Sequence, residues 1–262
     1  MGQIFGLCLV VWVSMSYNFH EDNLIPSVEP EKVYEAILDI ISDTSYGTVP
    51  YEEAWNMFGA MAWESFADAE GIGSESWNKT AFNPMAHTFD ENGDLLAVGV
   101  FQINIQNFPD MVMRSMIDTG YTDEFSFSPT VFSVKKNDWK ADDPDLEKKK
   151  QLFEAANIWV KMPENKYAIL QWAQDPNTFD VQKEIAKEAF MDREKKGLYG
   201  GTAWDAYRYG KIDSGHNVLE KQYGFTRFDQ PYLHGVATNT YDLDNSTEVE
   251  EKSLLDRLYN KF

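Results

Sequence analysis

Glu64 is the residue of this chain whose type and position best suit acid–base chemistry. It lies near the C-terminal end of a helix predicted over residues 50–71, directly after Trp63 and two positions before Phe66. Burial of a carboxyl group among apolar side chains raises its pKa, because its charged form is poorly solvated there. A carboxyl group that keeps its proton near neutral pH can act as a general acid. Glu64 is therefore a candidate general acid, although its position alone favours the alternative of a helix-terminal glutamate exposed to water.

A second candidate segment, AVGVFQIN at residues 97–104, changes from apolar to polar partway along. If it is a strand, Gln102 and Asn104 point to one face, because side chains alternate along a strand. Gly99 allows a close approach of backbone, either to the helix of Glu64 or to a ligand. The apolar residues expected to pack the segment in place are Val98, Val100, Phe101 and Ile103. We expect the two amides to face Glu64 across an open groove, although solvent-facing residues of an edge strand would show the same pattern.

The elements that must position these residues are mainly helices. Helical spacing of apolar residues, together with start and stop signals, predicts helices over the following ranges: 29–45, 50–71, 109–121, 143–161, 167–175 and 178–196. Residues 86–100 are typical of a β-hairpin, with Asn92-Gly93 as its turn. The predicted fold class is mainly α, an α+β arrangement in which a helical domain carries one small β-hairpin.

The domain organisation predicted from these patterns has three parts. Residues 1–28 form an apolar segment and a linker, residues 29–196 the catalytic domain, and residues 197–262 an irregular extension that ends in a helix over 247–262. The apolar run at residues 4–13 is too short for an ordinary transmembrane helix. It is either a signal-like export segment or a buried element of a larger assembly.

Composition and charge exclude several classes of function. The chain of 262 residues has a net charge of −20, which argues against nucleic acid as a partner, because binding phosphates requires clustered Lys and Arg. Cys8 is the single cysteine, so the sequence predicts neither an intramolecular disulfide nor a thiolate metal site. The four histidines are scattered without the spacing of metal ligands. We therefore expect no metal and no cofactor, and membrane contact only through the N-terminal segment, if at all.

Three short pieces occur in a specific order along the chain: Glu64-Ser65, the tetrapeptide NPMA at residues 83–86, and GVFQIN at residues 99–104. Together they resemble the lysozyme-like superfamily, which includes chicken-type and goose-type lysozymes, soluble lytic transglycosylases and phage tail lysozymes. In that family a Glu-Ser pair ends a helix, and the strand with the glutamine lines the sugar-binding cleft. The resemblance covers about residues 50–175, less than half of the chain.

This resemblance implies a function and a set of site residues. The function is that of a peptidoglycan-degrading lysozyme or lytic transglycosylase, which cleaves the MurNAc–GlcNAc β-1,4 bond with Glu64 as general acid and base. The implied substrate-binding residues are Ser65, Gly99, Phe101, Gln102, Asn104, Tyr167 and Trp172. The implied partners are a peptidoglycan glycan strand and, in a phage virion or tail, other virion proteins. The alternative setting is a secreted bacterial wall-remodelling enzyme, located outside the cell or in the periplasm.

The chain departs from the family's pattern at the second carboxylate. Chicken-type lysozymes carry an Asp two residues before the glycine of this strand, and here that position is Ala97. Asp90 and Asp94 lie nearby on the hairpin as possible replacements, although each also suits a turn. Without a second carboxylate, a transglycosylase route that uses Glu64 alone remains open. So does the alternative of an inactive structural or glycan-binding virion protein with the same fold.

Overall fold

A mainly helical fold with a small antiparallel sheet is confirmed by the computed structural model, which describes residues 27–42, 51–72, 79–122 and 140–227. The α-helices of the described residues are α2 (Pro30–Ser42), α3 (Tyr51–Glu64), α4 (Pro109–Asp118), α5 (Leu146–Lys161), α6 (Lys166–Gln174), α7 (Phe179–Lys195), α8 (Asp205–Arg208) and α9 (Ile212–Tyr223). Short 3-10 helices are η3 (Pro163–Asn165), η4 (Pro176–Thr178) and η5 (Gly200–Ala203). The predicted apolar segment at residues 4–13 and the predicted helix over 247–262 lie outside the described residues.

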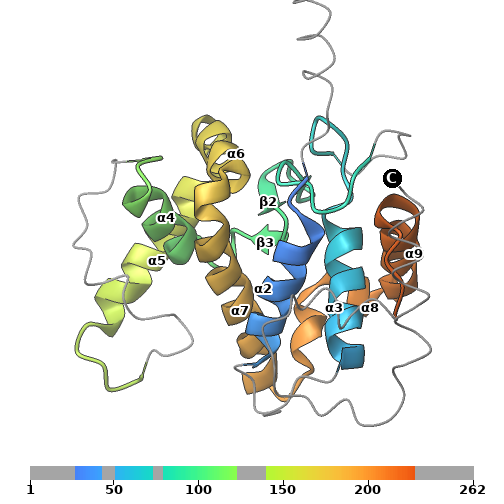
Figure 1. The fold of residues 1–262 in the computed structure, drawn as a ribbon. Coiled ribbons are helices and arrows are strands. Elements are labelled where there is room, and N and C mark those ends of the chain that lie inside the picture. The colour runs from blue at the N-terminus through green and yellow to red at the C-terminus, as the bar shows by residue number, and fades with distance from the viewer. Residues whose placement is uncertain (1–26, 43–50, 73–78, 123–139, 228–262) are drawn as a thin grey trace, which may run out of the picture.

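The helices form two groups on either side of α7 (Figure 1). In one group α3 packs between α2 and α9, and in the other α4 packs against α5 and α5 against α6. Helix α7 contacts both groups, through α2 and through α4. None of the helices in the described ranges is both long enough and apolar enough to cross a membrane.

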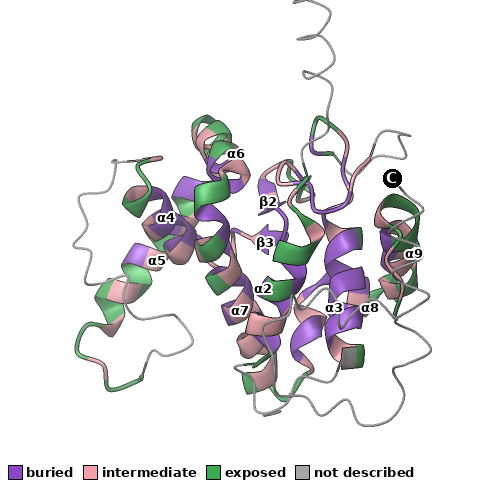
Figure 2. Ribbon diagram, viewed as in Figure 1, coloured by how far each residue is buried: buried purple, intermediate pink, exposed green. Residues whose placement is uncertain are grey.

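The core is built from the amphipathic faces that the sequence predicts. Helix α2 buries Val33, Ile37 and Ile40 at helical spacing, and its buried face points toward α3 and α7 (Figure 2). Phe58 of α3 lies at the centre of the core, with its ring centroid 5.1 Å from that of Tyr34 and 5.1 Å from that of Phe82. Large buried aromatic side chains of this kind supply much of the hydrophobic stabilisation.

The sheet confirms the predicted hairpin and adds a third strand. Strands β1 (His87–Phe89), β2 (Leu95–Val98) and β3 (Ile103–Asn104) pair antiparallel in the order β1-β2-β3. The turn between β1 and β2 is closed by a hydrogen bond from Gly93 N–H to the Asp90 carbonyl, with Gly93 at φ +83°. The left-handed backbone that this turn requires is readily adopted by glycine.

The expectation that residues 97–104 form one continuous strand is wrong. The chain leaves β2 at Val98 and makes a turn in which Gln102 N–H donates to the Gly99 carbonyl over 3.0 Å. Gln102 itself has a φ of +43°, which lies outside the strand region. Strand β3 therefore begins only at Ile103, so Gln102 and Asn104 are not alternating residues of one strand.

Helix α3 ends at Glu64, earlier than the predicted end near Gly71. The physical reason is a competing pairing: Ala67 exchanges two backbone hydrogen bonds with Thr80, at 3.1 and 2.9 Å, and this draws the chain out of the helix. Glu64 is thereby the terminal residue of the helix, and Ser65 is the first residue after it.

Residues 200–223 are not irregular, in contrast to the prediction. They form η5, α8 and α9, and their side chains Trp204, Ala206 and Leu219 belong to the same hydrophobic core as α2 and α3. Helix α9 ends at Gly224, whose φ of +73° makes a left-handed C-cap.

Helices α3 and α9 approach closely because glycines face each other at their contact. A Cβ atom added to Gly215 would lie 1.8 Å from the Gly59 carbonyl oxygen, and one added to Gly59 would lie 2.4 Å from the His216 ring. The His216 ring stacks on the Trp55 ring, with the centroids 4.7 Å apart. This close contact joins the segment that contains α8 firmly to the helix that carries Glu64.

We expect Gly215→Ala to destabilise the protein by about 1–3 kcal/mol, because the added methyl group must push α9 away from α3. Urea unfolding followed by circular dichroism measures this cost. Asn217→Ala, at an exposed position of the same helix, is the matched control and should change the stability by less than about 0.5 kcal/mol. Equal stabilities of the two variants would contradict the close packing described here.

Candidate functional site

The carboxyl group of Glu64 is held by a backbone donor from a distant part of the chain. The Ala206 N–H, in the first turn of α8, donates a hydrogen bond to Glu64 Oε1 over 2.6 Å. Glu64 is only partly accessible to solvent, as expected at the inner end of an amphipathic helix. The two partners are 142 positions apart in sequence, so tertiary packing alone brings them together.

Burial raises the pKa of Glu64 from 4.5 to about 7. The Ala206 hydrogen bond opposes this rise in pKa, the negative charge of Asp205 adds to it, and the positive charge of Arg208 opposes it. A carboxyl group with this pKa is about half protonated at pH 7. Glu64 can therefore donate a proton near neutral pH, although Trp63, one of the two apolar neighbours named in the prediction, is 37% exposed.

The segment from Trp204 to Arg208 connects Glu64 to the turn that precedes β3. Trp204 is buried, and its indole Nε1–H donates to the Phe101 carbonyl over 2.8 Å. The N–H of Ala206, two residues after Trp204, donates to the Glu64 carboxyl group. Arg208 in turn forms an ion pair with Asp205 at 3.2 Å. These contacts fix the carboxyl group relative to the residues around Gln102.

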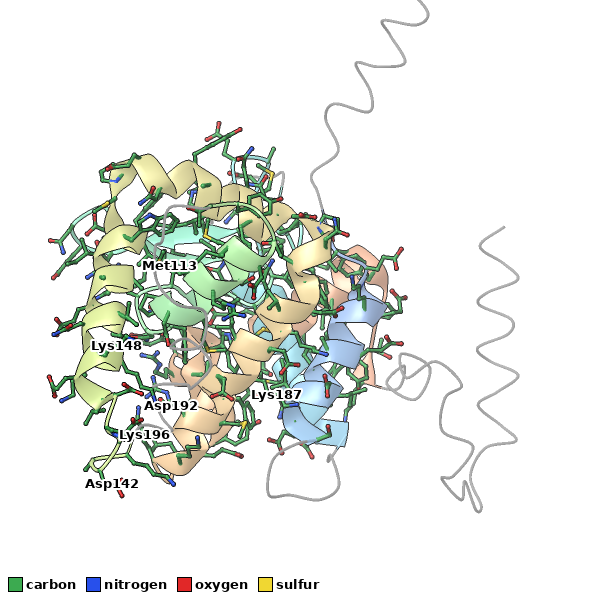
Figure 3. The ribbon with its side chains drawn as sticks, turned by 90° about the vertical axis from the view of Figure 1, so that its left-hand side faces the viewer. Met113, Asp142, Lys148, Lys187, Asp192 and Lys196 are labelled. Atoms are coloured by element: carbon green, nitrogen blue, oxygen red, sulfur yellow. The ribbon has the colours of Figure 1, made fainter. Side chains whose placement is uncertain are left out.

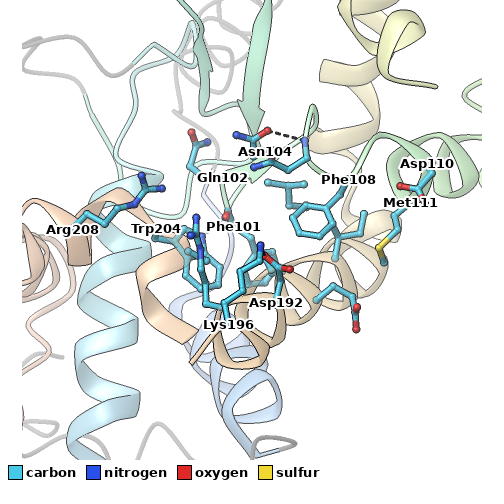
Figure 4. A pocket seen from close by; sticks show the side chains of 18 residues that line it. Phe101, Gln102, Asn104, Phe108, Asp110, Met111, Asp192, Lys196, Trp204 and Arg208 are labelled. Atoms are coloured by element: carbon cyan, nitrogen blue, oxygen red, sulfur yellow. Dashed lines mark hydrogen bonds and ion pairs between the residues drawn. The ribbon is translucent and has the colours of Figure 1, made fainter. Parts of the chain in front are cut away.

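A cavity of about 340 Å³ lies beside this segment (Figure 4). Its walls are the turn and β3, the start of α4, the second half of α7, and the side chains of Ala203, Trp204 and Arg208. Three of the predicted substrate-binding residues line it, namely Phe101, Gln102 and Asn104. Glu64 is not one of the lining residues, in contrast to the expectation that its carboxyl faces the two amides directly. It adjoins the cavity through Arg208, which lines the cavity and acts electrostatically on Glu64.

Gln102 and Gly99 shape the cavity wall through backbone contacts. The Gln102 side chain is 8% exposed, and its Nε2 donates to the carbonyls of Ala86 and Gly99, at 3.0 and 2.9 Å. Gly99 has a φ of +75°, and an added Cβ atom would lie 2.5 Å from the Gln182 Oε1 atom. The close approach at Gly99 is thus to α7, and neither to the helix of Glu64 nor to an open site.

Asn104 presents part of its amide to the cavity. Its Oδ1 accepts a hydrogen bond from the backbone N–H of Gln106 at 3.1 Å and another from that of Asn107 at 3.0 Å, the second of which is drawn in Figure 4. Its amide nitrogen makes no hydrogen bond within the described ranges, so it remains available as a donor to a ligand. Asn104 is the predicted binding residue whose geometry best suits that role.

The structure corrects the expectation that Ser65 contacts a substrate directly. The Ser65 side chain is fully buried; its hydroxyl donates to the Met61 carbonyl over 2.6 Å and accepts from the Phe82 N–H over 2.9 Å. Ser65 therefore ties the end of α3 to the loop before β1. It acts on the site only by holding Glu64 in place.

Replacing Ser65 by alanine is expected to cost about 1–3 kcal/mol, because the buried N–H of Phe82 loses its acceptor. Thermal unfolding measures the loss of stability. Below the melting transition the KM for any substrate should stay within about twofold of the wild-type value, since the hydroxyl reaches no open cavity. A large rise in KM at unchanged stability would restore the direct-contact role.

Tyr167 and Trp172 do not line the cavity. Trp172 is fully buried, and its Nε1–H donates to the Ser115 hydroxyl over 2.8 Å, so this ring belongs to the core. Tyr167 is 69% exposed on α6, where its hydroxyl accepts a hydrogen bond from the Gln171 amide. Neither side chain can form the floor of this cavity.

The two hairpin carboxylates also lie outside the cavity. Asp90 accepts hydrogen bonds from the N–H groups of Asn92 and Asp94 and from the Gln106 amide, and these bonds lower the pKa of Asp90. Asp90 and Asp94 are thus turn residues, and neither is placed as a second catalytic carboxylate. Ala97, at the position where the resemblance would place the second carboxylate, pairs with Asn104 across β2 and β3.

The cavity has other polar residues that the sequence did not reveal. Its carboxylates are Asp110, Glu188 and Asp192, and Asp110 and Glu188 are nearly buried. The sequence did hold a signal for Glu188: it lies three positions after the buried Ile185 and so falls on the inner, apolar face of its helix. A charged residue at such a position is unusual unless it is paired or functional. No comparable signal marked Trp204, which lies between η5 and α8. Ala206 was equally unmarked, because a helix of four residues shows no periodicity. Within the described ranges, no group of three or more His, Cys, Asp or Glu side chains could hold a metal ion.

Comparisons of this chain with protein-family models, with curated proteins and with solved structures find no match.

Proposed function

We propose that the protein cleaves the glycan strands of peptidoglycan, with Glu64 as the general acid. The observation that carries this proposal is a carboxyl group of raised pKa, fixed by the Ala206 N–H and adjoining a polar cavity that contains Gln102 and Asn104. A β-1,4 glycosidic bond breaks only when its oxygen receives a proton as it leaves, and a carboxyl group with a pKa near 7 supplies that proton at neutral pH.

The route that suits this site uses Glu64 twice. Glu64 first gives its proton to the glycosidic oxygen between MurNAc and GlcNAc, and the bond from the MurNAc C1 atom to that oxygen breaks. The resulting Glu64 carboxylate then takes the proton of the MurNAc C6 hydroxyl, whose oxygen bonds to C1 and forms an anhydro sugar. This lytic transglycosylase route needs neither a second carboxylate nor a water molecule. It fits a site in which Asp90 and Asp94 are held in a turn.

Incubation of the purified protein with insoluble peptidoglycan, followed by mass spectrometry of the soluble products, tests the proposal. Release of glycan fragments that end in anhydro sugars is the expected result. Fragments with reducing ends would show hydrolysis and would contradict the single-carboxylate route, while leaving the glycan-cleaving activity in place.

The second candidate is a glycan-binding protein of the same fold without activity. The observation that favours it is the position of Ala97, which leaves the usual second carboxylate missing from the sheet. In that case the same experiment releases no fragments, although the protein still sediments with the peptidoglycan.

A further inference from the structure

The cavity beside Glu64 is lined by three cations and by the three carboxylates Asp110, Glu188 and Asp192, and its two ends differ in charge. Arg208 lies at the end near Gln102 and Trp204, whereas Asp110 and Met111 lie at the opposite end (Figure 4). The C-terminal turn of α7 adds further cations to the lining, since Arg193 and Lys196 both contact the cavity. Three of the 23 basic residues of a chain with a net charge of −20 thus line one cavity.

Two of these three cations are partly neutralised by neighbouring carboxylates. Lys196 forms an ion pair with Asp192 at 2.6 Å, at the same end of α7 (Figure 3), and Arg208 pairs with Asp205 at 3.2 Å. Arg193 makes no ion pair with any other residue of the described ranges, and it is only partly accessible. Its guanidinium group is therefore the charge in the cavity that is open to an incoming anion.

We propose that Arg193, Lys196 and Arg208 form a subsite for carboxylate groups carried by the glycan strand. This inference rests on the proposed function, because it assigns the charged part of the same substrate. Arginine suits a carboxylate through two parallel N–H donors in a planar fork. A protein of net charge −20 repels an anionic polymer at long range, so local cations in the cavity are needed to hold such a strand.

Binding measurements in a Glu64→Gln background test this subsite without turnover of the ligand. Isothermal titration calorimetry compares two probes of equal length: a muramyl oligosaccharide with free carboxylates and a neutral chitooligosaccharide. Adding Arg193→Gln should weaken binding of the carboxylated probe by about tenfold, the usual effect of one charged hydrogen-bonded contact, and leave binding of the neutral probe unchanged. Arg193→Lys keeps the charge but loses the planar fork, so its affinity for the carboxylated probe should fall between those of Arg193 and Arg193→Gln.

Arg114→Gln, at an exposed ion pair on α4 outside the cavity, is the matched control and should leave binding of both probes unchanged. Equal weakening of the two probes by Arg193→Gln, or no weakening of either, would overturn the subsite. Tighter, Arg193-dependent binding of a glycerol-phosphate oligomer would also overturn it, because the recognised anion would then be a phosphate. If the wild-type protein releases no fragments from peptidoglycan while carboxylate binding still depends on Arg193, the cleavage proposal fails and the subsite stands.

Discussion

Replacing Glu64 by glutamine is expected to lower the rate of glycan cleavage by about a thousandfold, within the range that general acid–base catalysis contributes. Glutamine has nearly the same shape, and its Oε1 atom can still accept the Ala206 N–H bond, so the fold and the substrate affinity should be retained. What glutamine lacks is a proton that it can donate near neutral pH. Release of soluble fragments from peptidoglycan, measured at saturating substrate, gives the two rates.

Glu52→Gln is the matched control for this experiment. Glu52 lies on the same helix, is exposed, and forms an ion pair with Arg227 at 3.7 Å. Its replacement makes the same chemical substitution at the other end of α3, and the rate should stay within about twofold of the wild-type value because exposed ion pairs contribute little. A similar loss in both variants would show that overall charge, and not the carboxyl group of Glu64, determines the activity.

Glu64→Gln is also expected to change how stability depends on pH. The pKa of Glu64 is about 7 in the folded protein and 4.5 as a free side chain. Below pH 4.5 Glu64 is protonated in both states; as pH rises toward 7 the unfolded chain loses this proton first, so the folded protein loses stability. The shift corresponds to about 3 kcal/mol, all of which is lost once the pH exceeds 7.

Glutamine does not titrate, so the free energy of unfolding of the variant relative to wild type should rise by up to about 3 kcal/mol between pH 4.5 and pH 8. Urea unfolding of both proteins across this pH range measures the difference. A difference between Glu64→Gln and wild type that does not change with pH would mean that the pKa of Glu64 is not raised by folding.

Much of the helical framework could be predicted, because amphipathic periodicity is a local property of the sequence. The inner face of α2 is one example, and the hairpin turn at Asn92-Gly93 is another, since its left-handed conformation is specified by a glycine. The same pattern placed Glu64 near the C-terminal end of this helix, and its raised pKa agrees with the prediction, although the exact helix end depends on the distant pairing of Ala67 with Thr80.

The parts that could not be predicted depend on contacts between distant residues. The donor to Glu64 comes from Ala206, in a helix too short to show a period, and that helix is positioned by Trp204. Gln102 adopts a positive φ, which the sequence does not predict because neither a glycine nor a turn-forming residue stands at that position. The family resemblance implies a ligand contact for Ser65, and sequence alone does not show that packing at the helix end buries its hydroxyl.

The pH dependence of kcat/KM for glycan cleavage by the wild-type protein tests the central claim most directly, because it reports the ionisation of the free enzyme. If neutral Glu64 protonates the glycosidic oxygen, kcat/KM falls about tenfold for each pH unit above about 7, where Glu64 loses its proton. A value of kcat/KM that stays constant or rises between pH 7 and pH 9 would contradict this role for Glu64.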